Sequence, residues 1–248
     1  MNSNFNWETT SPTYNNDLTK SKGLPTFYDK FDLQNDFVNV YEPERDTFLL
    51  IDSIAFDIEH SSYYNTTNDI TSIEIGCGSG LVSACFINEL HKRKIQFNTH
   101  YCVDINKDAL TISEKLFTAS NLNSNNIKYV CSDLFEKFNQ DKQFDIIIFN
   151  PPYVTTDDEE YQRALLYKDI YASWAGGKNG SETIFKFASQ IKHYIKDNGI
   201  LYLLLSKENE YNEILLQLCN ECGFVYELLM KRNVVNEKLA VFKLYKKE

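Results

Sequence analysis

The chain has 248 residues, a formal net charge of −10 at pH 7 and a hydrophobic content of 43%. The length and the hydrophobic content allow one globular domain with its own core. The excess of acidic residues argues against an enzyme that binds nucleic acid directly, because such an enzyme normally carries a basic surface.

The first part of the chain is polar. Residues 1–36 are rich in Asn, Ser and Thr and show no apolar period, so we expect a flexible or loosely attached lead-in before a single domain over residues 37–248. Met1 to Thr10 lack the basic start and the apolar stretch of a secretory signal, and no apolar run has the length of a membrane span. The six cysteines lie mostly within apolar patterns, as reduced thiols do. We therefore expect a cytoplasmic protein without membrane contact, with the nucleus left open as a second location.

A helix is predicted ahead of the first strand. Pro43 suits the first turn of this helix, and Phe48, Leu49, Ile51 and Ile54 recur at helical spacing. We expect this helix to cover the ligand side of the sheet.

The first strand begins at Ile70 and leads into the glycine-rich turn Glu74-Ile75-Gly76-Cys77-Gly78-Ser79-Gly80. Alternate glycines let backbone approach a ligand closely and leave the N–H groups of the following helix free to meet negative charge. A dinucleotide fingerprint counted from Gly76 would need a glycine where Leu81 stands. The acid two residues before Gly76 and the G-x-G-x-G spacing favour S-adenosylmethionine over a nicotinamide.

Two further strands end in acids. Asp104 follows the strand from Tyr101, and Asp133 follows the strand from Ile127. Asp104 is placed to accept both ribose hydroxyls, and Asp133 to accept the adenine amino group, with Leu134 packed on the ring. Each acid alone is more often a helix N-cap or a solvated strand end. Their order at the carboxyl ends of successive strands favours the cofactor.

The strand Phe144–Phe149 ends in a stiff corner, Asn150-Pro151-Pro152-Tyr153. Neither proline has an N–H to donate, and each restricts the residue before it to extended dihedrals. Such a corner suits a planar group that carries an NH2, although proline pairs also end strands for structural reasons alone. The predicted catalytic residues are Asn150, Pro151, Pro152 and Tyr153. The Asn150 side-chain oxygen and the Pro151 carbonyl are expected to accept hydrogen bonds from the two N–H groups of the NH2. Tyr153 is expected to pack on the planar group.

The remaining patterns are less specific. The apolar stretches already described and a further one from Ile200 alternate with helical segments, which indicates a parallel sheet with helices on both faces. Residues 224–230 and 239–245 are expected to be closing strands separated by a charged turn. The acidic residues 157–160 are either a solvated loop or a surface that receives a basic peptide. The segment 174–180 is either a plain loop or a lid. No metal site is expected in this chain, because Cys219 and Cys222 have no second pair of ligands.

Together these motifs resemble the class I methyltransferases that methylate amino groups, which include the HemK-like glutamine N5-methyltransferases and the adenine-N6 DNA methyltransferases. Two further segments, Tyr41–Leu50 and Trp174–Gly180, resemble the small eukaryotic and archaeal branch that methylates the glutamine of the Gly-Gly-Gln loop in the class I translation release factor. The resemblance covers roughly residues 38–246. The chain departs from the family in a longer stretch between Ile87 and Asn98 and in its polar start.

The resemblance implies a Rossmann-like sheet of seven strands, mostly parallel with the last strand antiparallel, and S-adenosyl-L-methionine as cofactor. It implies contacts at Thr47, Glu74, Gly76, Asp104, Asp133, Leu134 and Asn150, to which the glycine turn and the residue after Asp104 add Cys77, Gly78, Gly80 and Ile105. It also implies a small zinc-binding activator subunit that forms a heterodimer with the chain, and Ile127–Val130 is the candidate edge for it.

Three alternatives to glutamine methylation remain open from the residues. Adenine-N6 methylation of DNA or RNA fits the same corner, although the net charge argues against it. Protein lysine methylation is a second alternative. A non-catalytic module that kept the fold is a third, and the intact Glu74, Asp104, Asp133 and Asn150 leave it little room.

Overall fold

The computed structural model describes residues 5–11, 27–122, 125–234 and 237–246, which form one seven-stranded sheet in the order β3-β2-β1-β4-β5-β7-β6. The strands are β1 (Ile70–Ile75), β2 (Phe97–Asp104), β3 (Ile127–Cys131), β4 (Phe144–Phe149), β5 (Ile195–Ser206), β6 (Phe224–Val234) and β7 (Glu237–Lys246). The pairs among β1 to β5 are parallel, and β7 is antiparallel to both β5 and β6. The predicted fold class is confirmed, and β2 and β5 begin earlier than the expected starts at Tyr101 and Ile200.

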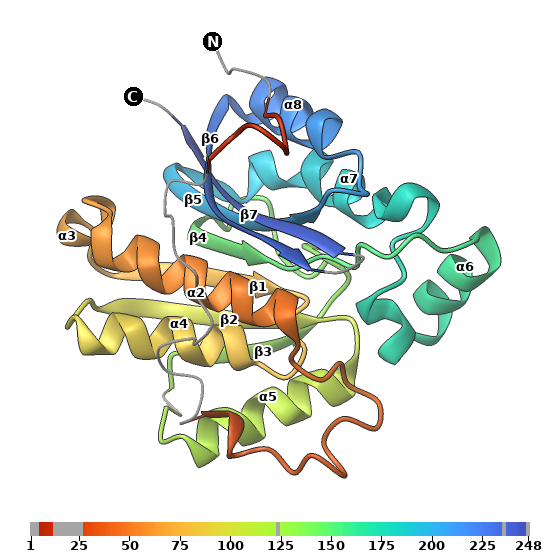
Figure 1. Cartoon of the computed structure of the whole chain (residues 1–248). Coiled ribbons are helices and arrows are strands. Elements are labelled where there is room, and N and C mark those ends of the chain that lie inside the picture. The colour runs from red at the N-terminus through yellow and green to blue at the C-terminus, as the bar shows by residue number, and fades with distance from the viewer. Residues whose placement is uncertain (1–4, 12–26, 123–124, 235–236, 247–248) are drawn as a thin grey trace.

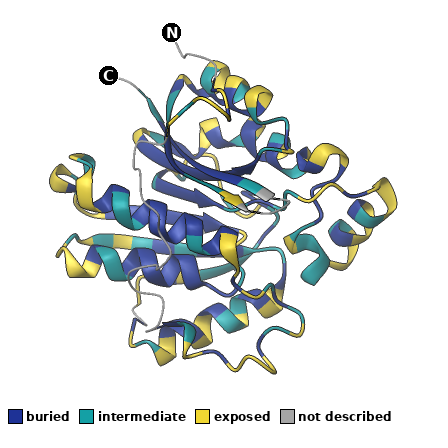
Figure 2. Ribbon diagram, in the orientation of Figure 1, coloured by how far each residue is buried: buried dark blue, intermediate teal, exposed yellow. Residues whose placement is uncertain are grey.

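Helices cover both faces of the sheet (Figure 1). The helices are α2 (Arg45–His60), α3 (Tyr63–Thr66), α4 (Leu81–Lys92), α5 (Lys107–Ala119), α6 (Asp158–Tyr167), α7 (Glu182–Gln190) and α8 (Tyr211–Cys222), with short 3₁₀ turns at 170–173, 178–180 and 191–193. Helix α6 lies to one side of the sheet (Figure 1). The central strands β1, β4 and β5 are mostly buried, β2 and β3 are only partly buried, and the outer faces of the helices are exposed (Figure 2).

The pleat of the strands divides the core in two. On β4, Ile146 and Ile148 pack in the layer that holds α2, α4 and α5, whereas Ile147 and Phe149 pack in the layer that holds α7 and α8. This follows from the period of two in a strand, which sends successive side chains to opposite faces. A continuous apolar run such as that of β4 is therefore what a strand covered on both faces requires.

Helix α2 begins at Arg45 after the N-cap residue Glu44, whose backbone N–H donates to the Thr47 hydroxyl at 3.4 Å. Pro43 thus lies immediately before the N-cap residue and outside the helix, so its expected place in the first turn was wrong. The apolar side of the helix packs into the core through Leu50, Ile54 and Ile58. The first turn of α2 carries polar residues to the carboxyl edge of the sheet.

Parts of the expected lead-in pack against the domain. Phe5 and Trp7 are buried, and the Phe5 ring lies 5.0 Å from the ring of Phe242 on β7, centroid to centroid. Phe27 and Phe31 are buried in the layer of α2. These four aromatic side chains attach parts of the segment to the domain, and as isolated residues they gave no apolar period to detect, while the expectation of a flexible or loosely attached lead-in over residues 1–36 stays a prediction. The rest of the lead-in lies outside the described residues, and the domain boundary at residue 37 stays a prediction.

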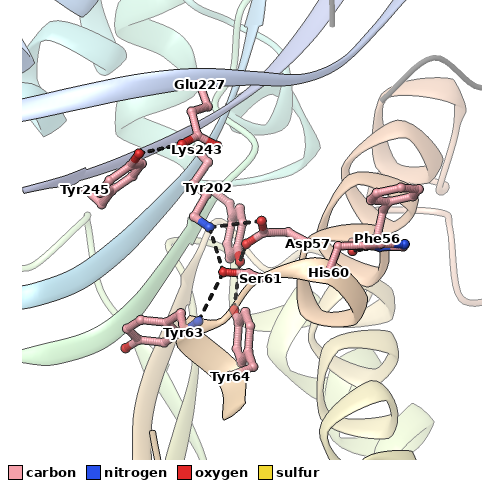
Figure 3. Close-up of polar contacts among 10 residues, drawn as sticks. All are labelled: Phe56, Asp57, His60, Ser61, Tyr63, Tyr64, Tyr202, Glu227, Lys243 and Tyr245. Carbon is pink, nitrogen blue, oxygen red and sulfur yellow. Dashed lines mark hydrogen bonds and ion pairs between the residues drawn. The ribbon is translucent and has the colours of Figure 1, made fainter. Parts of the chain in front are cut away.

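A buried polar network joins the C-terminal half of α2 to the sheet (Figure 3). Lys243 of β7 donates to Asp57 at 2.9 Å and to the Ser61 hydroxyl at 3.1 Å. The Tyr202 hydroxyl donates to the other Asp57 oxygen at 2.6 Å and lies 2.7 Å from the Tyr64 hydroxyl. This network fixes α2 across β5 and β7.

Candidate active site

The carboxyl ends of the parallel strands border a cavity at the point where the strand order reverses. Strand β1 pairs with β2 on one side and with β4 on the other, so the connections on its two sides run in opposite directions across the sheet. In open α/β sheets ligands bind at this switch point.

Most of the predicted residues meet there. The large cavity is lined by Gly76, Gly78, Asp104, Ile105, Asp133, Leu134, Asn150 and Pro152, together with Ala164 and Leu165 of α6. A smaller cavity beside it is lined by Thr47, Glu74, Gly76, Cys77, Gly78 and Asn150. Three predicted residues, Gly80, Pro151 and Tyr153, line neither cavity.

The glycine turn has the conformation that its residues predict. Gly76, Gly78 and Gly80 have φ angles of 65°, 51° and 78°, which favour glycine over other residues. Gly80 serves the packing of two helices, because a Cβ there would lie 2.2 Å from the Ser113 hydroxyl of α5. Gly80 lines neither cavity, so its predicted contact with the cofactor has no support from the cavity lining.

Asp104 is held by backbone N–H groups. One carboxylate oxygen accepts from the Gly78 N–H at 2.9 Å and the other from the Asn106 N–H at 2.8 Å. Burial raises the pKa of the Asp104 carboxyl to about 6, although these N–H groups lower it in part. The carboxylate is thus fixed at the cavity wall, as an acceptor for a diol must be.

Asp133 has a partner that the sequence did not reveal. Lys186 of α7 forms an ion pair with it at 2.7 Å between Nζ and Oδ2. Leu134, which lines the large cavity next to it, is buried and has a φ of 48°.

Glu74 is almost fully enclosed at 2% exposure, and its carboxyl group accepts a very short hydrogen bond from the Ser83 hydroxyl of α4. His100 of β2 joins this cluster, with Nε2 at 2.7 Å from the Ser83 hydroxyl and Nδ1 at 2.8 Å from the Ser72 hydroxyl. Burial raises the pKa of Glu74 well above its usual range. The acid is therefore part of the wall of the smaller cavity and of the core beneath it.

The Asn150 side chain is oriented by α2. Its Nδ2 donates to the carboxylate of Asp46 at 2.8 Å. Its Oδ1 is buried and has no hydrogen-bond partner among the described residues. Asp46 was not singled out from the sequence, although it lies within the segment Tyr41–Leu50 that carried the resemblance.

The backbone of the corner Asn150–Tyr153 is held by residues from later in the chain. The Asn209 side chain donates to the backbone oxygens of Tyr153, Asn179 and Gly180 at 3.0, 3.2 and 2.9 Å. Val154 and Ala175 form a parallel bridge. The segment 174–180 thus supports the corner, a role that neither of its two sequence interpretations, as a plain loop or as a lid, included. Nothing in the sequence points to Asn209.

Tyr153 faces the core. Its partly buried side chain packs against the layer of α2 and α4, and its carbonyl accepts from Asn209. The expected packing of Tyr153 on a planar substrate therefore has no support from the cavity lining.

Helix α6 begins at the acidic residues. Asp157 is its N-cap and accepts from the Glu160 N–H at 2.8 Å, so residues 157–160 form a helix start and not the expected loop. Acids in a first helical turn are stabilised by the helix dipole.

Within the described ranges no helix is long and apolar enough to span a membrane. The same residues include no group of three or more His, Cys, Asp and Glu that could hold a metal ion.

The fold and the site define a class I S-adenosylmethionine-dependent methyltransferase. A family model described as "Methyltransferase small domain" matches residues 62–167. Human "Methyltransferase HEMK2" is 30% identical over 212 residues, which cover 85% of this chain and 91% of that protein. "Putative protein N5-glutamine methyltransferase MJ0928" of Methanocaldococcus jannaschii is 31% identical and covers 84% of this chain and 92% of its own length.

A solved structure, titled as the E. cuniculi Mtq2–Trm112 complex responsible for methylation of the eRF1 translation termination factor, is similar with a TM-score of 0.57 and 26% identity. The match covers 84% of this chain and 99% of that one. The chain belongs to the HemK-like family of methyltransferases.

Proposed function

We propose that this protein transfers the methyl group of S-adenosylmethionine to the side-chain amide nitrogen, N5, of the glutamine in the Gly-Gly-Gln loop of a class I translation release factor. The observation that carries the proposal is the buried Oδ1 of Asn150, which has no hydrogen-bond partner among the described residues and belongs to a residue that lines both cavities. A buried acceptor without a partner costs free energy unless a ligand supplies the donor. The names of the Methanocaldococcus relative and of the solved complex support glutamine and the release factor as the substrate.

The residues of the chain act by orientation. An amide nitrogen is a poor nucleophile because its lone pair is delocalised, and the sulfonium of the cofactor supplies the electrophilic methyl group. Asn150 Oδ1 and the Pro151 carbonyl accept the two N–H bonds, which turns the lone pair towards the methyl group. These hydrogen bonds strengthen as the nitrogen gains positive charge, so they favour the transition state. The new N–C bond forms as the S–C bond breaks, and the methylated nitrogen then loses a proton to solvent.

The acids at the cavity fit the cofactor. We assign Asp104 to the ribose hydroxyls and Asp133 with Leu134 to the adenine. Thr47, Glu74, Gly76, Cys77, Gly78 and Ile105 complete the proposed cofactor contacts, all of them in the lining of one cavity or the other. Gly80 is retained in the proposal only as the residue that lets α4 start close to α5.

The test is methyl transfer to three acceptors: the release factor, its Gln→Ala variant and an oligonucleotide with an unpaired adenine. Transfer to the first alone supports the proposal. Transfer to the oligonucleotide alone would support the adenine alternative, and methyllysine in the Gln→Ala variant would support the lysine alternative.

The Asn150→Ala variant tests the role of the corner. We expect turnover to fall about 100- to 1,000-fold, because an oriented acceptor for the developing charge is lost. Cofactor affinity by calorimetry should stay near that of the wild type. Near-normal turnover would contradict the assignment.

We also infer a small zinc-binding partner subunit on the β3 edge, in keeping with the two-component complex of the similar structure. Strand β3 is at the end of the sheet, and Tyr129 and Val130 on it are half-buried, so a partner could cover apolar surface there. Charge substitution at Val130 should abolish co-purification with the partner. Full activity and a monodisperse state of the chain alone would contradict this inference. The release factor is a cytoplasmic substrate, so we place the protein in the cytoplasm, with the nucleus as a second location.

A further inference from the structure

The amide of Asn150 has two faces of nearly equal shape and opposite chemistry. Its oxygen accepts hydrogen bonds and its nitrogen donates them, so a rotation of half a turn would present an N–H group where the mechanism needs an acceptor. Something in the chain must therefore select one orientation. The corner itself does not, because prolines have no N–H to donate to the amide.

We propose that Asp46 is the positioning residue that turns Oδ1 of Asn150 towards the substrate NH2. The inference rests on the proposed function. The Asp46 carboxylate accepts from Asn150 Nδ2 at 2.8 Å, and the residue is 4% exposed. A carboxylate has only acceptors, so it can bond the nitrogen of the amide and repels the oxygen.

Asp46 is itself fixed on three sides. The oxygen that does not contact Asn150 lies 3.2 Å from the Tyr41 hydroxyl and 3.3 Å from the Thr47 hydroxyl, both of which donate to it. Asp46 also lies in the first turn of α2, where the helix dipole favours a negative charge. Asp46 itself lines the large cavity, but both of its carboxylate oxygens have partners in the chain, so we assign it to holding Asn150 and not to meeting the substrate.

The consequence for catalysis is a preset acceptor. Without Asp46, the amide would sample both orientations, and the inverted one places two donors against each other. A charge-assisted hydrogen bond of this kind corresponds to a preference of about 10- to 100-fold. We therefore expect Asp46 to affect turnover and to leave cofactor affinity nearly unchanged.

A double-mutant cycle distinguishes positioning from direct contact. Asp46→Ala, Asn150→Ala and the double variant are compared in methyl transfer to the release factor, each with cofactor affinity and thermal unfolding measured. Asp46→Ala should lower kcat about 30- to 100-fold with less than about threefold change in cofactor Kd. In the Asn150→Ala background the same change should cost less than about twofold, because the residue through which it acts is gone.

Two more variants guard against loss of folding. Asp46→Asn keeps the size of the side chain, and its amide can meet Asn150 with either face, so we expect an intermediate kcat. Asp52→Asn is the matched control, since Asp52 is a buried acid on the same helix that pairs with Arg232 at 3.8 Å and lines neither cavity. Its kcat should stay within about twofold of the wild type.

Each outcome decides the matter. Additive losses in the cycle would show that Asp46 contacts the substrate directly and would overturn the inference, as would a normal kcat for Asp46→Ala. A wild-type enzyme that methylates no glutamine would overturn the proposed function, and the role of Asp46 would fall with it. Wild-type transfer with an additive cycle would overturn the role of Asp46 alone.

Discussion

The two ends of helix α2 carry buried acids in opposite situations. At the C-terminal end, Asp57 is paired with Lys243 and Tyr202, and Tyr64 completes the set of hydrogen bonds (Figure 3). At the N-terminal end, Asp46 holds Asn150, whose Oδ1 has no hydrogen-bond partner in the described part of the chain. A closed polar network supports the fold, whereas an incomplete one is stable only where a ligand completes it. The difference separates the structural end of the helix from the end at the proposed active site.

Removal of Lys243 should produce the largest loss of stability. Lys243→Met leaves the Asp57 charge buried without its cation, so we expect the free energy of unfolding to fall by about 3–5 kcal/mol. Chemical denaturation measures this, and kcat of the folded fraction should stay normal. Lys246→Met is the control, because solvent screens the pair of Lys246 with the exposed Asp197 and its loss should change the stability little. A loss of kcat in Lys243→Met at full folding would break the separation of the two ends.

A substitution at Gly180 tests whether the segment 174–180 holds the corner Asn150–Tyr153 in place. A Cβ at Gly180 would lie 2.0 Å from the Tyr153 carbonyl oxygen, and the φ of Gly180 is +65°. Gly223 has nearly the same φ, +70°, with no atom within 4 Å of a Cβ. Both alanine variants bear the cost of a left-handed residue, about 1–2 kcal/mol. Gly180→Ala alone should also shift the corner and lower kcat about 10- to 100-fold. Equal kcat values for the two variants would show that the segment 174–180 does not position Asn150.

The pH dependence of cofactor affinity should reveal Asp104. Because the pKa of Asp104 is about 6, its carboxylate is ionised at pH 7 and becomes protonated as the pH falls through 6. Cofactor affinity should therefore fall about tenfold between pH 7 and pH 5, since a protonated acid is the poorer acceptor. Asp104→Asn should bind weakly with a flat profile, and a flat wild-type profile would contradict the ribose assignment.

The stability of the ligand-free protein should change in the opposite direction. An acid whose pKa is raised by folding contributes stability at low pH, and this contribution is lost as the pH rises through the folded-state pKa of about 6. Asp52, with a pKa also raised to about 6 by burial, adds to the same trend without affecting the cofactor. The Asp52→Asn variant should therefore reduce the pH dependence of stability and leave that of binding intact.

The smallest effect concerns the acidic start of α6. Charge reversal at Asp158 and Glu159 should raise KM for a basic protein substrate about threefold and leave kcat unchanged, because exposed charges mainly influence encounter. Asp157 is spared, since it caps the helix. An unchanged KM would assign these acids to helix stability alone.

Much of the site follows from local sequence. The turn Glu74–Gly80 and the acids after β2 and β3 were found because strand ends and turns depend on neighbouring residues. The roles of Asn209 and Lys186 were not predicted from the sequence, because each bonds a residue that is distant in the chain. Asn209 bonds Tyr153, and Lys186 bonds Asp133. The burial of Phe5 and Trp7 was not predicted either, because single aromatic residues in a polar segment show no apolar period.

The sequence by itself determined the order of strands and helices, the cofactor turn and the corner Asn150–Tyr153, since these rest on periodicity and on the backbone limits of glycine and proline. Only the tertiary structure decided which side chains complete the site. It placed Asp46 against Asn150, turned Tyr153 into the core and tied the segment 174–180 to the corner. Contacts between distant residues depend on the packing of whole elements, and that packing leaves no local pattern to read.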